Sequence, residues 1–105
     1  YYGVSGSGRV LHTINPRLSV DQIAWIINDA DDRVLCFDLT FAPLVAAVHA
    51  RCPGVRQWVA LCDTDRLPAD PAIPGLVSYE AWIAGAASDY DWPQFDERSA
   101  ATLCY

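Results

Sequence analysis

The sequence predicts an α/β fold in which a parallel β-sheet has helices packed against it. Short β-prone runs alternate along the chain with longer amphipathic segments, a pattern typical of β-α-β units. One short run, residues 34–37 (VLCF), is apolar throughout, as expected for a strand covered on both faces of a parallel sheet. Hydrophobic residues make up 52% of the 105 residues and charged residues 19%, which is enough apolar material for a packed core.

The first part of the chain predicts a helix end, a strand and a capped helix. Residues 1–4 resemble the tail of a helix, and residues 10–14 form a strand that stops before Pro16, because proline disfavours helix in the preceding residue. Ser19 and Gln22 have the spacing of a capping box. The helix that follows ends in a polar cluster at residues 28–32. Its apolar face consists of Val20, Ile23, Ile27 and Ala30.

A second helix and a third strand follow the apolar run. Asp38 stands at the carboxyl end of that run, and a helix is expected to begin near Thr40 or Phe41, with Pro43 tolerated in its first turn. Its apolar stripe is formed by Phe41, Leu44, Val45 and Val48. The Cys-Pro-Gly sequence at residues 52–54 stops this helix, and residues 57–62 form the third strand.

The last part of the chain predicts loops, a short helix and a final strand. Residues 66–77 are rich in proline and are expected to be irregular. Ser78 is a plausible cap for a short helix over residues 79–83. Residues 88–97 are acidic and aromatic and predict a surface loop pinned by Trp92 and Phe95. Residues 100–105 read as a buried strand.

The resulting order, β-α-β-α-β-loop-α-loop-β, predicts a three-layer Rossmann- or flavodoxin-like sheet with right-handed crossovers. The chain starts without methionine and stops on its last strand. We therefore expect an internal segment of a larger protein, which ends before the loop that usually carries chemistry at a strand's carboxyl end.

Composition excludes several classes of function. The net charge is −6, and all seven basic residues are Arg, which disfavours binding to nucleic-acid phosphates. The sequence contains no Lys. These residues therefore cannot supply the Lys of a Schiff-base enzyme, of a phosphate-binding loop or of a receiver domain. No apolar run is long enough to span a membrane, and no signal peptide is visible. The chain is expected to be cytoplasmic.

The candidate functional residues each have a structural explanation. The four cysteines, Cys36, Cys52, Cys62 and Cys104, lack zinc spacing and are expected to be buried free thiols. His12 could contact a ligand near a strand end, but a partly buried structural histidine is the simpler interpretation. His49 and Arg51 suit the end of a helix. Asp38, Asp63 and Asp65 suggest an acidic magnesium pocket, although capping and turn roles explain them equally well.

Two stretches carry a resemblance to a known family. Residues 10–28, with Asn15-Pro16-Arg17-Leu18 leading into the capped helix, and residues 90–105, with Asp91-Trp92-Pro93 and the final strand, resemble AMP-forming acyl-CoA synthetases. Within that adenylate-forming superfamily, the chain is most similar to the medium- and long-chain fatty-acid–CoA ligases and to methylmercaptopropionate-type ligases. Arg9 departs from the small residue expected before the first strand.

The resemblance implies an ATP-dependent ligase that converts a fatty or other carboxylic acid to an acyl-adenylate and then to a CoA thioester. ATP, Mg²⁺ and CoA would serve the longer protein, here called the parent, which could form a homodimer. Residues 1–105 would belong to the large N-terminal domain and end just before the ATP phosphate-binding loop, at Tyr105. The segment itself would be scaffold, inactive alone, with no catalytic, cofactor-binding or metal-binding residue.

One alternative stays open. The chain could be a complete flavodoxin-like or receiver-like module that binds a partner or a small ligand. A cooperative, monomeric fold and a stop after Tyr105 would favour this alternative, whereas a Ser/Thr/Gly-rich loop ending in Lys directly after Tyr105 would favour the ligase.

Overall fold

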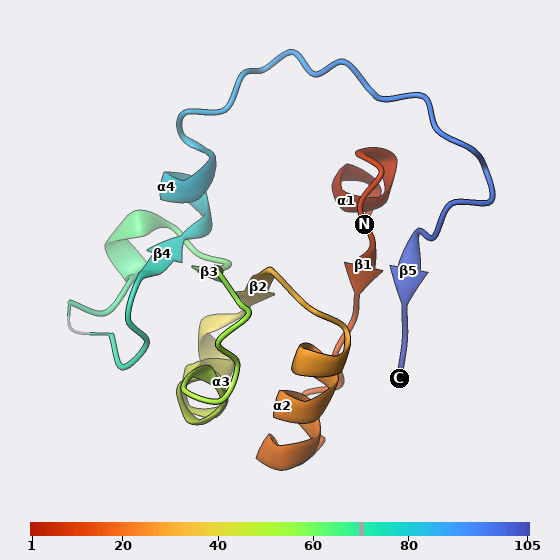
Figure 1. Ribbon diagram of the computed structural model, residues 1–105. Helices are drawn as coiled ribbons and strands as arrows, with labels where there is room; N and C mark the ends of the chain where they lie inside the picture. The colour runs from red at the N-terminus through yellow and green to blue at the C-terminus, as the bar shows by residue number, and fades with distance from the viewer. Residues whose placement is uncertain (70) are drawn as a thin grey trace. The chain divides into compact units, whose positions relative to one another are not determined.

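A computed structural model describes residues 1–69 and 71–105 (Figure 1). The chain divides into two compact units: a terminal unit, residues 1–15 and 87–105, and a central unit, residues 16–86. Every strand pair among the described residues is parallel. The predicted α/β class with parallel strands and flanking helices is confirmed, but the strands form two sheets, where the sequence suggested one.

The sheet of the central unit has the order β2-β3-β4. Its strands are β2 (Val34–Phe37), β3 (Gln57–Ala60) and β4 (Leu76–Ser78). In register, Cys36 of β2 lies beside Val59 of β3, and Val59 lies beside Val77 of β4. Val59 and the following Ala60 are fully buried, at 0% exposure. The middle strand is therefore the core of this unit.

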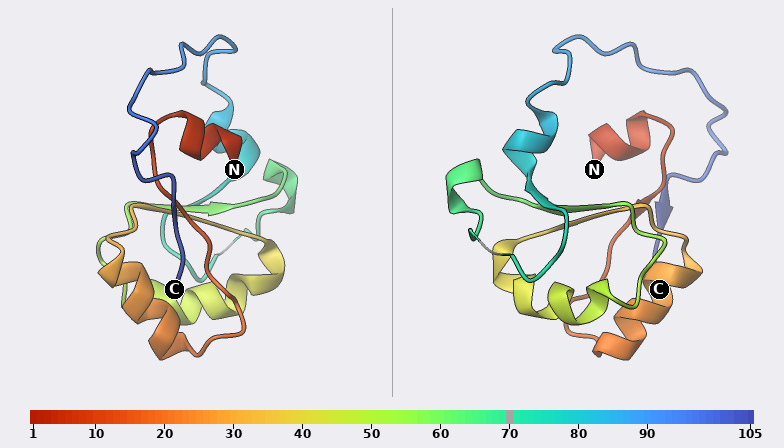
Figure 2. Two further views of the ribbon diagram at one scale, coloured as in Figure 1. Left: turned by 90° about the vertical axis from the view of Figure 1, so that its right-hand side faces the viewer. Right: turned by 60° about the vertical axis from the view of Figure 1, so that its left-hand side comes forward.

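Helices lie on both faces of this sheet. Helices α2 (Val20–Asp29) and α3 (Ala42–His49) lie on one face, and the short α4 (Tyr79–Ile83) lies on the other (Figure 2). Short 3₁₀ turns, η1 (Leu39–Phe41) and η2 (Thr64–Arg66), follow β2 and β3. Helix α2 buries four residues of its apolar face: Ile23, Ala24, Ile26 and Ile27. The three-layer order expected from the sequence is therefore present in the central unit.

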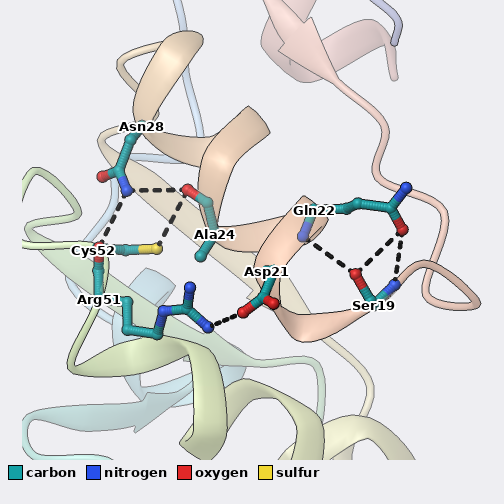
Figure 3. A network of polar contacts seen from close by, with 7 residues as sticks. All are labelled: Ser19, Asp21, Gln22, Ala24, Asn28, Arg51 and Cys52. Carbon is teal, nitrogen blue, oxygen red and sulfur yellow. Dashed lines mark hydrogen bonds and ion pairs between the residues drawn. The ribbon is translucent and has the colours of Figure 1, made fainter.

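The predicted capping box starts α2. The backbone N–H of Gln22 donates to Oγ of Ser19 at 3.2 Å, and the backbone N–H of Ser19 donates to Oε1 of Gln22 at 3.0 Å (Figure 3). Two N–H groups that lack partners within the helix are thereby satisfied. The capping box thus fixes the residue at which α2 begins.

A polar clamp joins α2 to the end of α3. Nδ2 of Asn28 donates to the carbonyl of Ala24 at 2.8 Å and to the carbonyl of Arg51 at 2.9 Å (Figure 3). The buried Cys52 directs its thiol at the same Ala24 carbonyl, at 3.9 Å, and Arg51 forms an ion pair with Asp21 at 2.6 Å. The ion pair is exposed and contributes little, so the amide of Asn28 is the main polar tie between these segments.

The terminal unit contains α1 (Tyr2–Gly6) and a parallel pair of short strands, β1 (Leu11–His12) and β5 (Thr102–Leu103), which lie side by side (Figure 1). The carbonyl of Ala101 accepts from the N–H of Leu11 at 2.9 Å and from the hydroxyl of Ser5 at 3.0 Å. A single carbonyl group, just before β5, therefore binds both β1 and α1.

Two aromatic residues pack on glycines of the terminal unit. A Cβ atom added at Gly6 would lie 2.8 Å from a ring carbon of Trp92, and one added at Gly8 would lie 3.5 Å from the ring of Phe95. Gly8 also has a φ of +74°, which favours glycine. Trp92 and Phe95 do hold the loop as predicted, although they remain 56% and 49% exposed.

Four expectations differ from the structure. The strands at residues 10–14, 57–62 and 100–105 are shorter than predicted. Strand β4 lies in part within the stretch expected to be irregular: its residues pair with β3, although the prolines and the glycine just before them indicated a loop. Strand β2 is an edge strand, and Val34 is 44% exposed. The final strand is exposed, with Leu103 at 36%.

No helix within the described residues is both long and apolar enough to cross a membrane.

The capping box generates a testable prediction. Replacing Ser19 with Ala removes the acceptor for the N–H of Gln22, and the free energy of unfolding should fall by about 1 kcal/mol in urea titrations followed by circular dichroism. The Ser19→Asp variant keeps an acceptor at this position and should lose at most a few tenths of a kcal/mol. Equal losses in the two variants would contradict a capping role for Ser19.

Candidate functional site

The carboxyl ends of the parallel strands are where a functional site is expected, because ligands of open α/β sheets bind there. Each unit of this chain presents one such edge. In the central unit, Asp38 follows β2, Asp63 follows β3 and Ser78 ends β4. In the terminal unit, His12 ends β1 and Tyr105 follows β5.

Ser78 is buried at the edge of the central sheet and makes only structural contacts there. Its hydroxyl oxygen lies 2.9 Å from Oγ1 of Thr64 and accepts the backbone N–H of Ala81 at 3.2 Å. The side chain is 1% exposed. Ser78 is therefore the N-cap of α4, as the sequence predicted.

Asp38 caps the turn after β2. Its Oδ1 accepts the backbone N–H of Thr40 at 2.9 Å. This bond, the hydroxyl of Thr40 and the more distant charge of Arg66 together hold the pKa of the Asp38 carboxyl below its ordinary value. The structure thus gives Asp38 the capping role that was one of its two interpretations.

The acidic residues of this edge do not form a metal centre in the part of the chain that the structure describes. Among residues 1–69 and 71–105, no group of three His, Cys, Asp or Glu side chains is arranged to hold a metal ion. Asp63 precedes η2 without a side-chain capping bond, and Asp65 lies within that turn. The hypothesis of a magnesium pocket at Asp38, Asp63 and Asp65 therefore gains no support.

Each of the two histidines contacts an aromatic ring in a tilted arrangement. The ring of His49, at the end of α3, lies 4.9 Å from the ring of Trp58 with an interplanar angle of 50°. Trp58 is the second residue of β3 and is 4% exposed. His49 is therefore a packing residue of the central unit, in keeping with its structural interpretation.

His12 meets Tyr105 at the edge of the terminal unit. Their ring centroids are 5.3 Å apart, with an interplanar angle of 46°. Nε2 of His12 is shielded from solvent, whereas the Tyr105 side chain is 52% exposed. This pair lies where the parallel strands β1 and β5 end.

The ring pair could not be found from local sequence. His12 was recognised as a candidate because of its strand, but its partner lies 93 positions further along the chain, as their numbers give (105 − 12). The signal that brings them together is the strand pairing: His12 pairs with Leu103, and Tyr105 lies two residues beyond Leu103, after the end of β5.

All four cysteines are free thiols, as expected, but only Cys52 is fully buried. Cys36 and Cys104 are exposed and Cys62 is intermediate. Desolvation raises the pKa of the Cys36 and Cys52 thiols, which favours the protonated form of both.

The chain is similar over its full length to several curated acyl-CoA ligases. It is 44% identical to the medium-chain-fatty-acid–CoA ligase of Ectopseudomonas oleovorans and 47% identical to the 3-methylmercaptopropionyl-CoA ligase of Ruegeria pomeroyi. It is 37% identical to the long-chain-fatty-acid–CoA ligase of Thermus thermophilus. Each match covers 100% of this chain but only 18–19% of the relative. No protein-family model matches.

A solved structure has the same fold. The crystal structure of an anthranilate CoA ligase in complex with anthranoyl-AMP matches 97% of this chain with a TM-score of 0.82, and the match covers 18% of that protein. At 22% sequence identity this match supports the fold alone. The resemblance to acyl-CoA synthetases that the sequence motifs indicated is confirmed by the curated relatives.

The capping role of Asp38 predicts a specific titration. In the native protein its carboxyl should titrate below 3.8, the ordinary value. In the Thr40→Val variant the midpoint should move back up towards 3.8, because one of the two bonds from Thr40 is lost. Because the folded-state pKa is the lower one, the stability from this bond is present above the unfolded-state pKa and disappears as pH falls through the folded-state pKa.

Carboxyl-detected NMR titration measures this midpoint directly. The Thr64→Val variant is the matched control, since Thr64 contacts Ser78 and not Asp38. A midpoint for Asp38 that is the same in the Thr40 variant as in the native protein would show that the hydroxyl of Thr40 does not affect this carboxyl.

Proposed function

Because the chain is related along its whole length to acyl-CoA ligases, we propose that it is a segment of an ATP-dependent, AMP-forming fatty-acyl-type CoA ligase. The observation that carries this proposal is the 44–48% identity over all 105 residues to ligases of a medium-chain fatty acid and of 3-methylmercaptopropionate. These relatives are named for different acids, so the proposal specifies a carboxylic acid and leaves its chain length to experiment.

The proposed reaction has two steps. A carboxylate oxygen attacks the α-phosphate of ATP, and the bond to pyrophosphate breaks, which gives an acyl-adenylate. The thiol of CoA, as its thiolate, then attacks the acyl carbon, and AMP leaves as the thioester forms. Negative charge accumulates on phosphate oxygens in the first step, so hydrogen-bond donors and a cation are needed there.

The residues that meet these needs are proposed to lie in other parts of the parent. Mg²⁺ would neutralise charge on the phosphates when bound, but the described residues of this chain offer no cluster of ligands for it. The chain also contains no Lys. We accordingly assign no catalytic residue to residues 1–105.

The proposed role of residues 1–105 is to form part of the scaffold of the large N-terminal domain. In the parent, the loop that binds the ATP phosphates would follow strand β5, directly after Tyr105. The parallel pairing of β5 with β1 supports this placement, because phosphate-binding loops follow the carboxyl ends of parallel strands. A cytoplasmic location and a homodimeric parent are further parts of the proposal, to be examined by fractionation and by light scattering.

Carboxylate-dependent exchange of pyrophosphate into ATP tests the function. The full-length parent should catalyse the exchange with medium- or long-chain acids or with 3-methylmercaptopropionate, whereas the isolated 105-residue chain should show none, because it lacks the donors and metal ligands of the first step. A panel lacking any acid is the control. Exchange by the isolated chain, or a full-length protein inactive with every acid, would overturn the proposal.

A further inference from the structure

The ring contact of His49 with Trp58 shows which side chains of the central sheet lie on which face. Trp58 of β3 is on the face of α3, because its ring lies 4.9 Å from that of His49. Side chains alternate along a strand, so Val59 is on the opposite face, where α4 lies (Figure 2). Cys36 of β2 is the register partner of Val59. Cys36, and Val34 two residues before it, are therefore on the face of α4.

This second face is poorly covered over β2. Val34 is 44% exposed and Cys36 is also exposed. Phe37, which lies on the face of α2 and α3, is only 6% exposed. Strands of a parallel sheet are normally covered on both faces, so β2 has one covered face and one open face.

Helix α4 adds further open apolar surface on the same side of the sheet. It packs against β3 and β4. Its large apolar residues, Tyr79, Trp82 and Ile83, have the i, i+3, i+4 spacing of one helix face. They remain 38%, 45% and 36% exposed. A helix face of this kind is normally packed against another element, so this stripe lacks part of its cover.

The dimensions of helices and strands indicate what is missing. Neighbouring helices pack with their axes about 8–10 Å apart, whereas neighbouring strands lie about 4.8 Å apart, so one helix covers about two strands. The first face of this three-stranded sheet has two helices, α2 and α3. Within the described part of the central unit, α4 is the one helix on the second face. A second helix fits there, over β2.

We propose that Val34, Cys36, Tyr79, Trp82 and Ile83, here called the β2–α4 patch, form the docking site of an apolar helix face from the same polypeptide, outside residues 1–105. The inference rests on the proposed function only in taking the chain to be a segment of a longer protein. About four fifths of the length of the curated relatives lies outside the match. No residue of the patch is charged, which suits a permanent apolar cover better than a transient partner.

The thiol of Cys36 is a built-in probe of this patch in the full-length parent. N-ethylmaleimide should modify Cys36 at least about 100-fold more slowly in the native parent than in the parent unfolded in urea, because a docked helix must open before the reagent enters. Peptide mass spectrometry resolves the site of modification. The matched control is Ala47→Cys, since Ala47 is exposed on α3. Its introduced thiol should lose less than about tenfold in rate on folding.

The outcomes separate the possible covers. Slow modification of Cys36 in a monomeric parent at every protein concentration supports the docked helix. Protection that disappears on dilution, as light scattering shows a dimer dissociating, assigns the patch to a second copy and overturns the proposal. Modification of Cys36 as fast as that of the control thiol, in a parent active in pyrophosphate exchange, overturns the docking site alone. A parent with a protected Cys36 and no exchange overturns the proposed function alone.

Discussion

The central unit depends on the burial of strand β3. This strand has a parallel neighbour on each edge and helices on both faces, and Val59 and Ala60 are completely removed from solvent. Its backbone groups can be satisfied only if β2 and β4 are both in register, because no water reaches them. The positions of β2 and β4, and of the helices attached to them, follow from this requirement.

The polar clamp connects α2 with the end of α3 on one face of the sheet. The amide of Asn28 joins a carbonyl within α2 to the carbonyl of Arg51 after α3. Each helix is followed along the chain by a strand of the sheet, α2 by β2 and α3 by β3. The carboxyl edge then presents capping residues, Asp38 and Ser78, whose polar atoms are already engaged.

The terminal unit has a different character, because a few contacts hold together two segments from opposite ends of the sequence. The hydrogen bonds to the Ala101 carbonyl and the ring contact of His12 with Tyr105 are among them. Large aromatic side chains remain half exposed around them, Trp92 and Phe95 among them. In the proposed ligase, the chain would continue from β5 of this unit to the loop that binds the ATP phosphates.

The sequence by itself determined the elements whose signals are local. The capping box at Ser19, strand β2, the proline in the first turn of α3 and the helix capped by Ser78 were all predicted, because each depends on residues within a few positions of one another. The family resemblance was also readable, since its motifs are contiguous. Tertiary structure decided the rest. Strand β4, the edge position of β2, the division into two sheets and the meeting of His12 with Tyr105 all depend on pairing between distant segments, and no local pattern specifies which segments will pair.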